Sequence, residues 1–130
     1  MRTYQDRLAL TRSVLGTRIR IRLYQTQGDD FNRWMKEDMP AELYSTVSCV
    51  FADQFEGYMV PETEKKLKAF AGRISAHITT CASNHYDISR LLDSVEAFVA
   101  ADLQNMHIWC RDIADTMYSQ VDTDNYTFVW

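Results

Sequence analysis

Side chains that bind zinc in many proteins recur at four-residue intervals near the middle of the chain, in the stretch HITTCASNH. At this spacing His77, Cys81 and His85 would share one face of a helix, and both imidazole nitrogen and thiolate sulfur are zinc ligands. A locally hydrogen-bonded histidine beside a small core cysteine fits the same pattern. His77 and Cys81 are therefore only weak metal candidates, and we expect neither a metal nor a cofactor.

A closed zinc site would need two further ligands, and His107 and Cys110 have suitable residue types. If the last helix forms a hairpin with residues 61–83, His107 lies about 20 residues beyond the turn, on the order of 25 Å from Cys81 at 1.5 Å per residue. Only a break near Gln104–Asn105 would fold the last helix back. We therefore expect Cys81 and Cys110 to be small core residues.

Acidic residues spaced three apart are the next candidates for chemistry. Asp53 with Glu56, and Asp112 with Asp115, have the spacing that helical two-metal enzymes use. Neither pair has a histidine nearby to complete a ligand set, and both are expected on solvated helix faces. We therefore assign no catalytic carboxylate.

Sequence motifs of nucleophilic and nucleotide-dependent enzymes are missing. The chain holds no GxSxG, GxxxxGK[ST] or GxGxxG, and its four glycines cannot build a phosphate-binding loop. Cys49 falls inside an apolar helical segment with no base nearby in the sequence, so we expect it in the core. The protein is predicted not to be an enzyme.

The composition favours helices. The chain has 130 residues, 46% hydrophobic and 25% charged, which suits one globular domain with a substantial core. Four glycines and two prolines are too few for a many-stranded sandwich. We predict an all-α bundle of four to five helices over residues 1–121, followed by an acidic and aromatic tail over residues 122–130.

Apolar residues at intervals of three and four mark the helices. One helix is predicted from Pro61 to about Asn84, and a long C-terminal one from an Asp87 N-cap to residue 121, with or without the break near Gln104–Asn105. A third begins near Pro40 and ends before Gly57. A short helix over DDFNRWMKED, capped by Asp29 or Asp30, precedes it.

The opening stretch GTRIRIRLYQTQG is ambiguous. Residues 18–24 alternate between charged and apolar, as a strand does, and the only partner would be the tail YTFVW. The alternative fold is thus α+β, with residues 17–25 and 125–130 in a two-stranded ribbon. A window over residues 3–27 favours a helix, because one apolar stripe then collects Tyr4, Leu8, Leu15, Ile19 and Leu23.

A second apolar stripe on this N-terminal helix consists of Leu10, Val14 and Ile21. A helix that is apolar on two sides must lie between two neighbours, or between its own bundle and another molecule. We therefore predict self-association through these three residues and a homo-oligomer.

Charge is distributed unevenly around the net value of −4. Residues 1–28 carry six arginines and one acid, whereas residues 87–130 carry eight acids and two bases. The basic segment pairs with acidic helices or faces a polyanion, and the sequence leaves both open. The candidate residues for binding a partner or nucleic acid are Arg7, Arg12, Arg18, Arg20, Arg22, Lys65, Lys66 and Lys68, of which Arg7, Arg18 and Arg22 share one strip.

Three widely spaced cysteines, the lack of a secretory signal and the lack of a membrane-length apolar run indicate a cytoplasmic protein that does not enter membranes. The aromatic residues of the tail, Tyr126, Phe128 and Trp130, could cap the core or dock on a partner. We predict a small non-enzymatic protein-interaction module, a regulator or inhibitor compatible with a phage or mobile-element origin. The alternatives are a nucleic-acid-associated helical subunit of a larger ribonucleoprotein complex and a metal-binding helical protein.

Overall fold

In the part of the chain that the structure describes, five helices follow one another and there is no strand. The structure is a computed structural model that describes residues 3–26, 28–55, 61–106 and 109–112. The all-α prediction is confirmed. The helices are α1 (Tyr4–Gln25), α2 (Asp29–Glu37), α3 (Met39–Gln54), α4 (Pro61–Ser83) and α5 (Ile88–Asn105).

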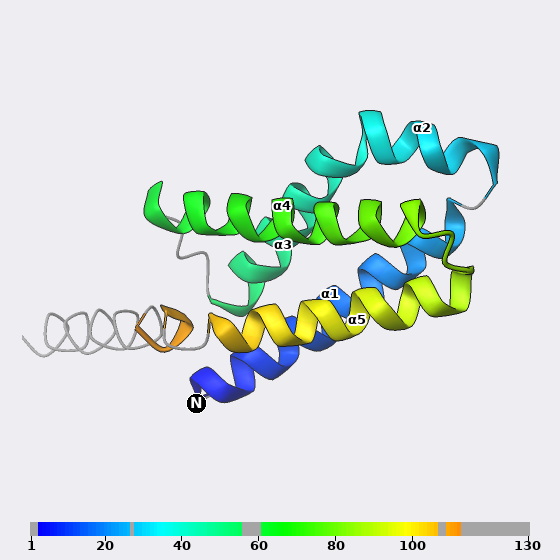
Figure 1. The fold of residues 1–130 in the computed structure, drawn as a ribbon. Coiled ribbons are helices and arrows are strands. Elements are labelled where there is room, and N and C mark those ends of the chain that lie inside the picture. Colours follow the sequence, from blue (N-terminus) through cyan, green and yellow to red (C-terminus); the bar gives the residue numbers. More distant parts are fainter. Residues whose placement is uncertain (1–2, 27, 56–60, 107–108, 113–130) are drawn as a thin grey trace, which may run out of the picture.

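Four of the helices form a bundle in which each has two neighbours. Helix α1 packs on α3 and α5, and α4 packs on the same two helices from the opposite corner, while α2 rests on α3 (Figure 1). The core fills the space between the four. Its fully buried larger side chains come from all of them: Leu15, Leu23, Met39, Val47, Val50, Phe51, Phe55, Leu67, Phe70, Ile74, Ile78 and Leu103.

Helix α1 resolves the ambiguity of the opening stretch. Leu15, Ile19 and Leu23 are all buried, so the four-residue period over the whole helix prevails over the two-residue alternation of residues 18–24. A capping box starts the helix, because the Thr3 hydroxyl accepts from the Asp6 N–H and the Asp6 carboxylate accepts from the Thr3 N–H. The α+β alternative is therefore wrong for residues 17–25, and residues 125–130 lie outside the described part.

The expected helix boundaries are largely confirmed. Asp87 caps α5, its carboxylate accepting the Arg90 N–H at 2.8 Å. Helix α5 stops at Asn105, which is where the sequence left a break open as one of two alternatives, and residues 109–112 are helical again. The cap of α2 was predicted wrongly: Gly28 is its N-cap, with φ 98°, and no side chain bonds there.

The three cysteines divide in a way that the sequence did not predict fully. Cys81 and Cys110 are buried, as expected, but Cys49 is exposed on α3 although its neighbours Val47 and Val50 are in the core. All three are free thiols. Because the whole segment is apolar, its sequence did not predict which face of α3 is exposed to solvent.

Among the described helices, none combines the length and the apolar character needed to cross a membrane.

Replacing the capping carboxylate of α5 tests how the bundle is held at this turn. Asp87→Ala should lower the free energy of unfolding by about 1 kcal/mol, because the Arg90 N–H loses its acceptor. Urea denaturation followed by circular dichroism measures this change. Asp53→Ala, at an exposed position without a cap, is the control and should stay within about 0.5 kcal/mol of the wild type.

Candidate interaction surface

The outward face of α1 carries a mainly apolar row, of which Val14 alone packs against the core. Leu10, Val14, Thr17, Ile21 and Tyr24 follow one another at intervals of four, three, four and three, and we call them the α1 stripe. Leu10 is 36% exposed, Ile21 51% and Tyr24 68%, and they are the exposed large hydrophobic side chains of the described residues. Val14 is half-buried against the core. The second stripe predicted from the sequence thus faces outward at Leu10 and Ile21.

Tyr24 was not predicted as part of this surface. It lies three residues after Ile21, so the same spacing rule would have found it. Ile21, Tyr24 and Leu92 of α5 line a shallow depression of about 400 Å³ at the C-terminal end of α1. The apolar area therefore extends from α1 onto α5.

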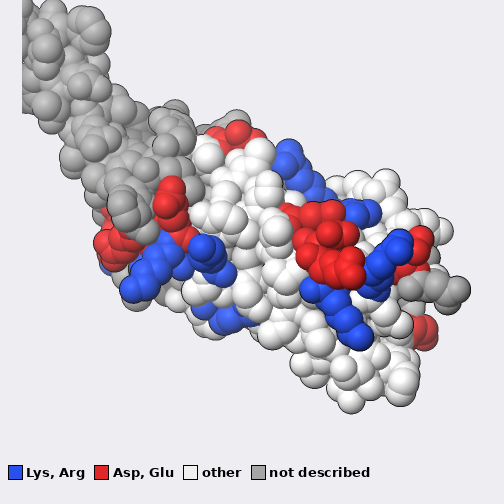
Figure 2. All heavy atoms as spheres, turned by 90° about the horizontal axis from the view of Figure 1, so that it is seen from above, with Lys and Arg blue, Asp and Glu red and all other residues white. Residues whose placement is uncertain are grey.

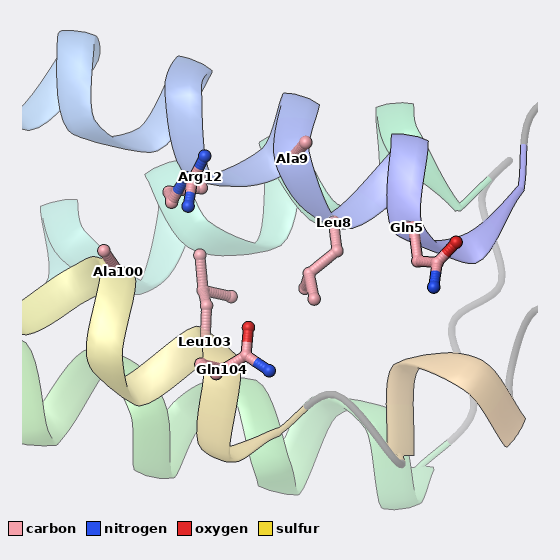
Figure 3. A pocket seen from close by; sticks show the side chains of 7 residues that line it. All are labelled: Gln5, Leu8, Ala9, Arg12, Ala100, Leu103 and Gln104. Carbon is pink, nitrogen blue, oxygen red and sulfur yellow. The ribbon is translucent and has the colours of Figure 1, made fainter.

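A groove runs along the seam between α1 and α5. Figure 3 shows its first part, where Gln5, Leu8, Ala9 and Arg12 of α1 face Ala100, Leu103 and Gln104 of α5. The next part of the groove is lined by Arg12, Ser13, Thr17, Asp93, Glu96, Ala97 and Ala100. The groove is lined by polar and charged side chains together with the small residues Ala9, Ser13, Ala97 and Ala100.

The two ends of this second part of the groove differ in charge. The Arg20 guanidinium lies 3.0 Å from the Glu96 carboxylate and 3.8 Å from that of Asp93. Arg12 makes no ion pair with another described residue. One end of the groove thus has two carboxylates for one guanidinium, and the other has the Arg12 guanidinium, which pairs with no described residue.

Arg22 is bound within the fold. Its guanidinium donates two hydrogen bonds to the Glu42 carboxylate, at 2.8 and 3.0 Å, and stacks over the Trp34 ring at 5.1 Å. The Trp34 indole N–H donates to the same carboxylate at 2.9 Å. Hydrogen bonding from Arg22, with a smaller contribution from Trp34, lowers the pKa of Glu42 despite partial desolvation. The same pair raises the pKa of Arg22.

Arg7 and Arg18 complete the predicted strip but have different surroundings. Arg7 is buried, and its guanidinium donates to the Gln54 carbonyl at 2.6 Å, tying α1 to the end of α3. Arg18 is exposed and makes no ion pair with another described residue. The strip therefore divides into a buried residue, an exposed one and, in Arg22, a residue paired with α3.

Lys65, Lys66 and Lys68 are exposed on α4, the helix diagonal to α1. Two of them rest above aromatic rings, Lys66 over Trp109 at 5.7 Å and Lys68 over Tyr44 at 5.8 Å. Figure 2 views the molecule from the side on which α2 lies, and basic and acidic side chains are interspersed there. The lysines and the α1 arginines therefore occupy separate parts of the bundle.

The weak metal candidates lie in a small polar cluster between α4 and α5. His77 Nε2 is 2.9 Å from Ser94 Oγ and 3.6 Å from Cys81 Sγ, and the imidazole stacks on Phe98 at 4.4 Å. Ser94, seventeen positions away, was not predicted to join them. No three His, Cys, Asp or Glu side chains converge anywhere in the described residues.

The remaining metal candidates do not join that cluster in the described residues. His85 lies beyond the end of α4 with φ 59°, so it does not continue the helical face of His77 and Cys81. Burial raises the pKa of the Cys110 thiol to about 12, which opposes the thiolate that a metal would need. His107 and the tail residues Tyr126, Phe128 and Trp130 lie outside the described residues.

Comparisons of the chain with family models, curated proteins and solved structures find no match.

The pKa of Glu42 gives a pH-dependent test of the contact between α1 and α3. Glu42→Gln should lower the free energy of unfolding at neutral pH by about 1 kcal/mol, as expected for a half-exposed pair. The stabilisation is complete above the ordinary pKa of 4.5 and is lost as the pH falls through the lower folded-state value.

Urea denaturation across this pH range measures the difference between Glu42→Gln and the wild type. The two should converge at the acid end of the range. Glu37→Gln, an exposed carboxylate without a resolved partner, is the control. A difference for Glu42→Gln that persists at acid pH would show that the effect does not come from its ionisation.

Proposed function

We propose that the protein is a non-enzymatic protein-interaction module that binds a protein partner through the α1 stripe. The observation that carries this proposal is the exposure of Leu10, Ile21 and Tyr24 on one face of a single helix. Exposed apolar residues scattered singly are common on monomers, whereas three on one face of a single helix favour a binding surface. Tyr and aliphatic side chains in such a row supply contact area at low entropic cost.

The packing of α1 against the rest of the bundle also favours a binding surface on its outer side. Helix α1 is held on its inner side by α3 and α5, through Leu15, Ile19 and Leu23 in the core and the Arg7 bond to α3. A surface on such a supported helix loses little conformational freedom when a partner binds. We propose that the module acts as a regulator or inhibitor by occupying a surface of a larger molecule.

A reducing, cytoplasmic location is part of the proposal. Cys49 is an exposed free thiol and Cys81 and Cys110 are buried free thiols. Free thiols persist where glutathione and thioredoxin keep cysteines reduced. The composition and size remain compatible with a phage or mobile-element protein.

Association with nucleic acid is the second candidate, and the unpaired cations of α1 favour it. Arg12 and Arg18 make no ion pair with another described residue, and Lys65 is exposed on α4. Guanidinium groups bind phosphate in a bidentate manner. This candidate requires retention on nucleic acid that decreases with salt and is lost in Arg12→Glu and Arg18→Glu.

A capture experiment with matched variants tests the proposed function. The tagged full chain, Ile21→Glu and Ala69→Glu are used to capture partners from native-host lysate, with and without nuclease. Ala69 is exposed on α4, diagonal to α1, so it controls for an added surface charge. A partner should be retained by the wild type and Ala69→Glu and reduced at least about tenfold by Ile21→Glu, which places a carboxylate in the apolar contact.

Circular dichroism and thermal unfolding confirm that both variants fold. Equal capture by Ile21→Glu and the wild type would overturn the role of the stripe. Release of the captured material by nuclease would favour the nucleic-acid candidate instead.

A further inference from the structure

The groove between α1 and α5 continues over three hollows that lie in line. The first two meet at Arg12 of α1 and Ala100 of α5, which line both of them. The third is the depression at Tyr24 and Leu92. The two helices are antiparallel, so residue numbers rise along the groove on α1 and fall on α5 (Figure 3). A linear segment that follows the groove therefore meets the three hollows in this order.

The chemical character of the groove changes along this order. Arg12 makes no ion pair with another described residue. In the second hollow the Asp93 and Glu96 carboxylates share one guanidinium. The third hollow is mainly apolar, and Tyr24 lies twelve residues, or about 18 Å of helix, beyond Arg12. A complementary occupant presents an anion, then a hydrogen-bond donor, then large apolar side chains.

The tail over residues 122–130, DTDNYTFVW, has side chains in this order and lies outside the described residues. In an extended segment, alternate side chains share one side. One side of an extended tail would carry two acids, a phenol and two apolar rings: Asp122, Asp124, Tyr126, Phe128 and Trp130. The other side would be polar apart from its valine: Thr123, Asn125, Thr127 and Val129. The pattern is that of a segment with one side bound and the other in water.

The spacing of the tail matches that of the groove. Side chains two positions apart in an extended segment are separated by about 6.6 Å. With Asp124 beside Arg12, the Tyr126 hydroxyl comes to the second hollow, where it can donate to a carboxylate. Trp130 then lies about 20 Å beyond Arg12, close to the level of Tyr24 in the third hollow.

The tail is long enough to reach this position. Trp109 stacks on Phe51 near the end of α3, and Arg7 of α1 bonds to the last residue of α3. Residues 109–112 therefore lie at the end of the bundle where α1 begins. The twelve residues from there to Asp124 can span about 40 Å. Arg12 is only five residues, or about 8 Å of helix, further along α1 than Arg7.

Two features oppose this arrangement. The lining positions move round α1 between Arg12 and Tyr24, so the segment must cross the helix obliquely. Asp93 and Glu96 also repel an acidic segment. With Asp124 at Arg12, both acids of the tail stay on the side of this arginine that faces away from the two carboxylates. All of these groove charges are exposed, so water and salt screen the repulsion.

From these observations we infer that the tail of the same chain binds in the groove between α1 and α5 as an extended segment, with Asp124 paired with Arg12 and Trp130 beside Tyr24. The inference goes beyond the proposed function, because it assigns an occupant to a groove and not to the α1 stripe. Tyr24 belongs to both surfaces, so the tail competes with a protein partner at that end of the stripe.

Limited digestion of the folded full chain with chymotrypsin tests this occupancy. Mass spectrometry follows cleavage after Tyr126 and Phe128, whose rate depends on how often the tail leaves the groove. Arg12→Glu should raise this rate about fivefold, because it replaces the attraction to Asp124 by repulsion. Lys65→Glu, an exposed charge reversal on α4, is the control and should leave the rate unchanged.

A charge swap makes the digestion test specific for one pair. Arg12→Glu combined with Asp124→Arg should restore the slow cleavage of the wild type. Circular dichroism confirms that each variant folds. Equal cleavage rates for Arg12→Glu and the wild type, or a charge swap that does not restore protection, would overturn the inference.

Disulfide crosslinking tests the position of the tail in a Cys49→Ser background, which removes the exposed native thiol. Ala97→Cys with Tyr126→Cys should form a reducible link within one chain on mild oxidation, because both positions lie at the second hollow. Ala69→Cys on α4 with Tyr126→Cys is the control. Equal linking of the control pair, or links that join two chains, would contradict binding of the tail to its own groove.

This inference and the proposed function can fail separately. A wild-type tail that is cleaved as fast as that of Arg12→Glu would overturn the inference, while loss of partner capture in Ile21→Glu would still support the stripe. A protected tail together with equal capture by Ile21→Glu and the wild type would support the inference and overturn the proposed partner site.

Discussion

The rotation of α1 about its own axis is the constraint on which the rest of the surface depends. Leu15, Ile19 and Leu23 are almost completely buried between α3 and α5, and each loses stabilisation if the helix turns. Burying a large aliphatic side chain contributes roughly 1.5–3 kcal/mol, so three of them outweigh any single polar contact of the helix. Once they are seated, the positions of every other α1 side chain are fixed, including the outward direction of Leu10, Ile21 and Tyr24.

The ion pairs follow from this rotation and set the contacts between helices. Arg22 reaches Glu42 on α3, Arg20 reaches Glu96 on α5, and away from α1 the Arg73 side chain of α4 pairs with Asp102 of α5 at 2.8 Å. Exposed pairs such as Arg20–Glu96 contribute about 0–1 kcal/mol each, so they add little to the stability that the core provides. These pairs match opposite charges between α1 and α3, α1 and α5, and α4 and α5. A helix shifted along its axis would lose this match, so the pairs favour the observed alignment. The basic N-terminal segment thus pairs partly with the acidic remainder of the chain.

The sequence predicted the helices well because burial on one side imposes a regular period. The period of α1 extends over 22 residues, and this length outweighed the strand-like alternation of residues 18–24. Features that depend on how different helices pack against each other could not be predicted from the sequence. The contact between His77 and Ser94 depends on how α4 and α5 are aligned along their axes. The exposure of Cys49 depends on which side of α3 faces the core. The strip of Arg7, Arg18 and Arg22 was predicted as a row on α1, but the α3 partners of Arg7 and Arg22 were not.

Stability and binding are separable on α1, and the side chain of Ile21 shows why. A β-branched residue has no advantage over alanine in a helix, and at 51% exposure Ile21 gains little from burial. The isolated bundle therefore gains less stabilisation from this half-exposed side chain than from Ile19, which is 3% exposed. The same reasoning applies to Tyr24, which is still more exposed. The inner face of α1 builds the fold, while its outer face leaves Ile21 and Tyr24 exposed. In the proposed interaction, a change on the outer face would therefore alter binding with little effect on the core.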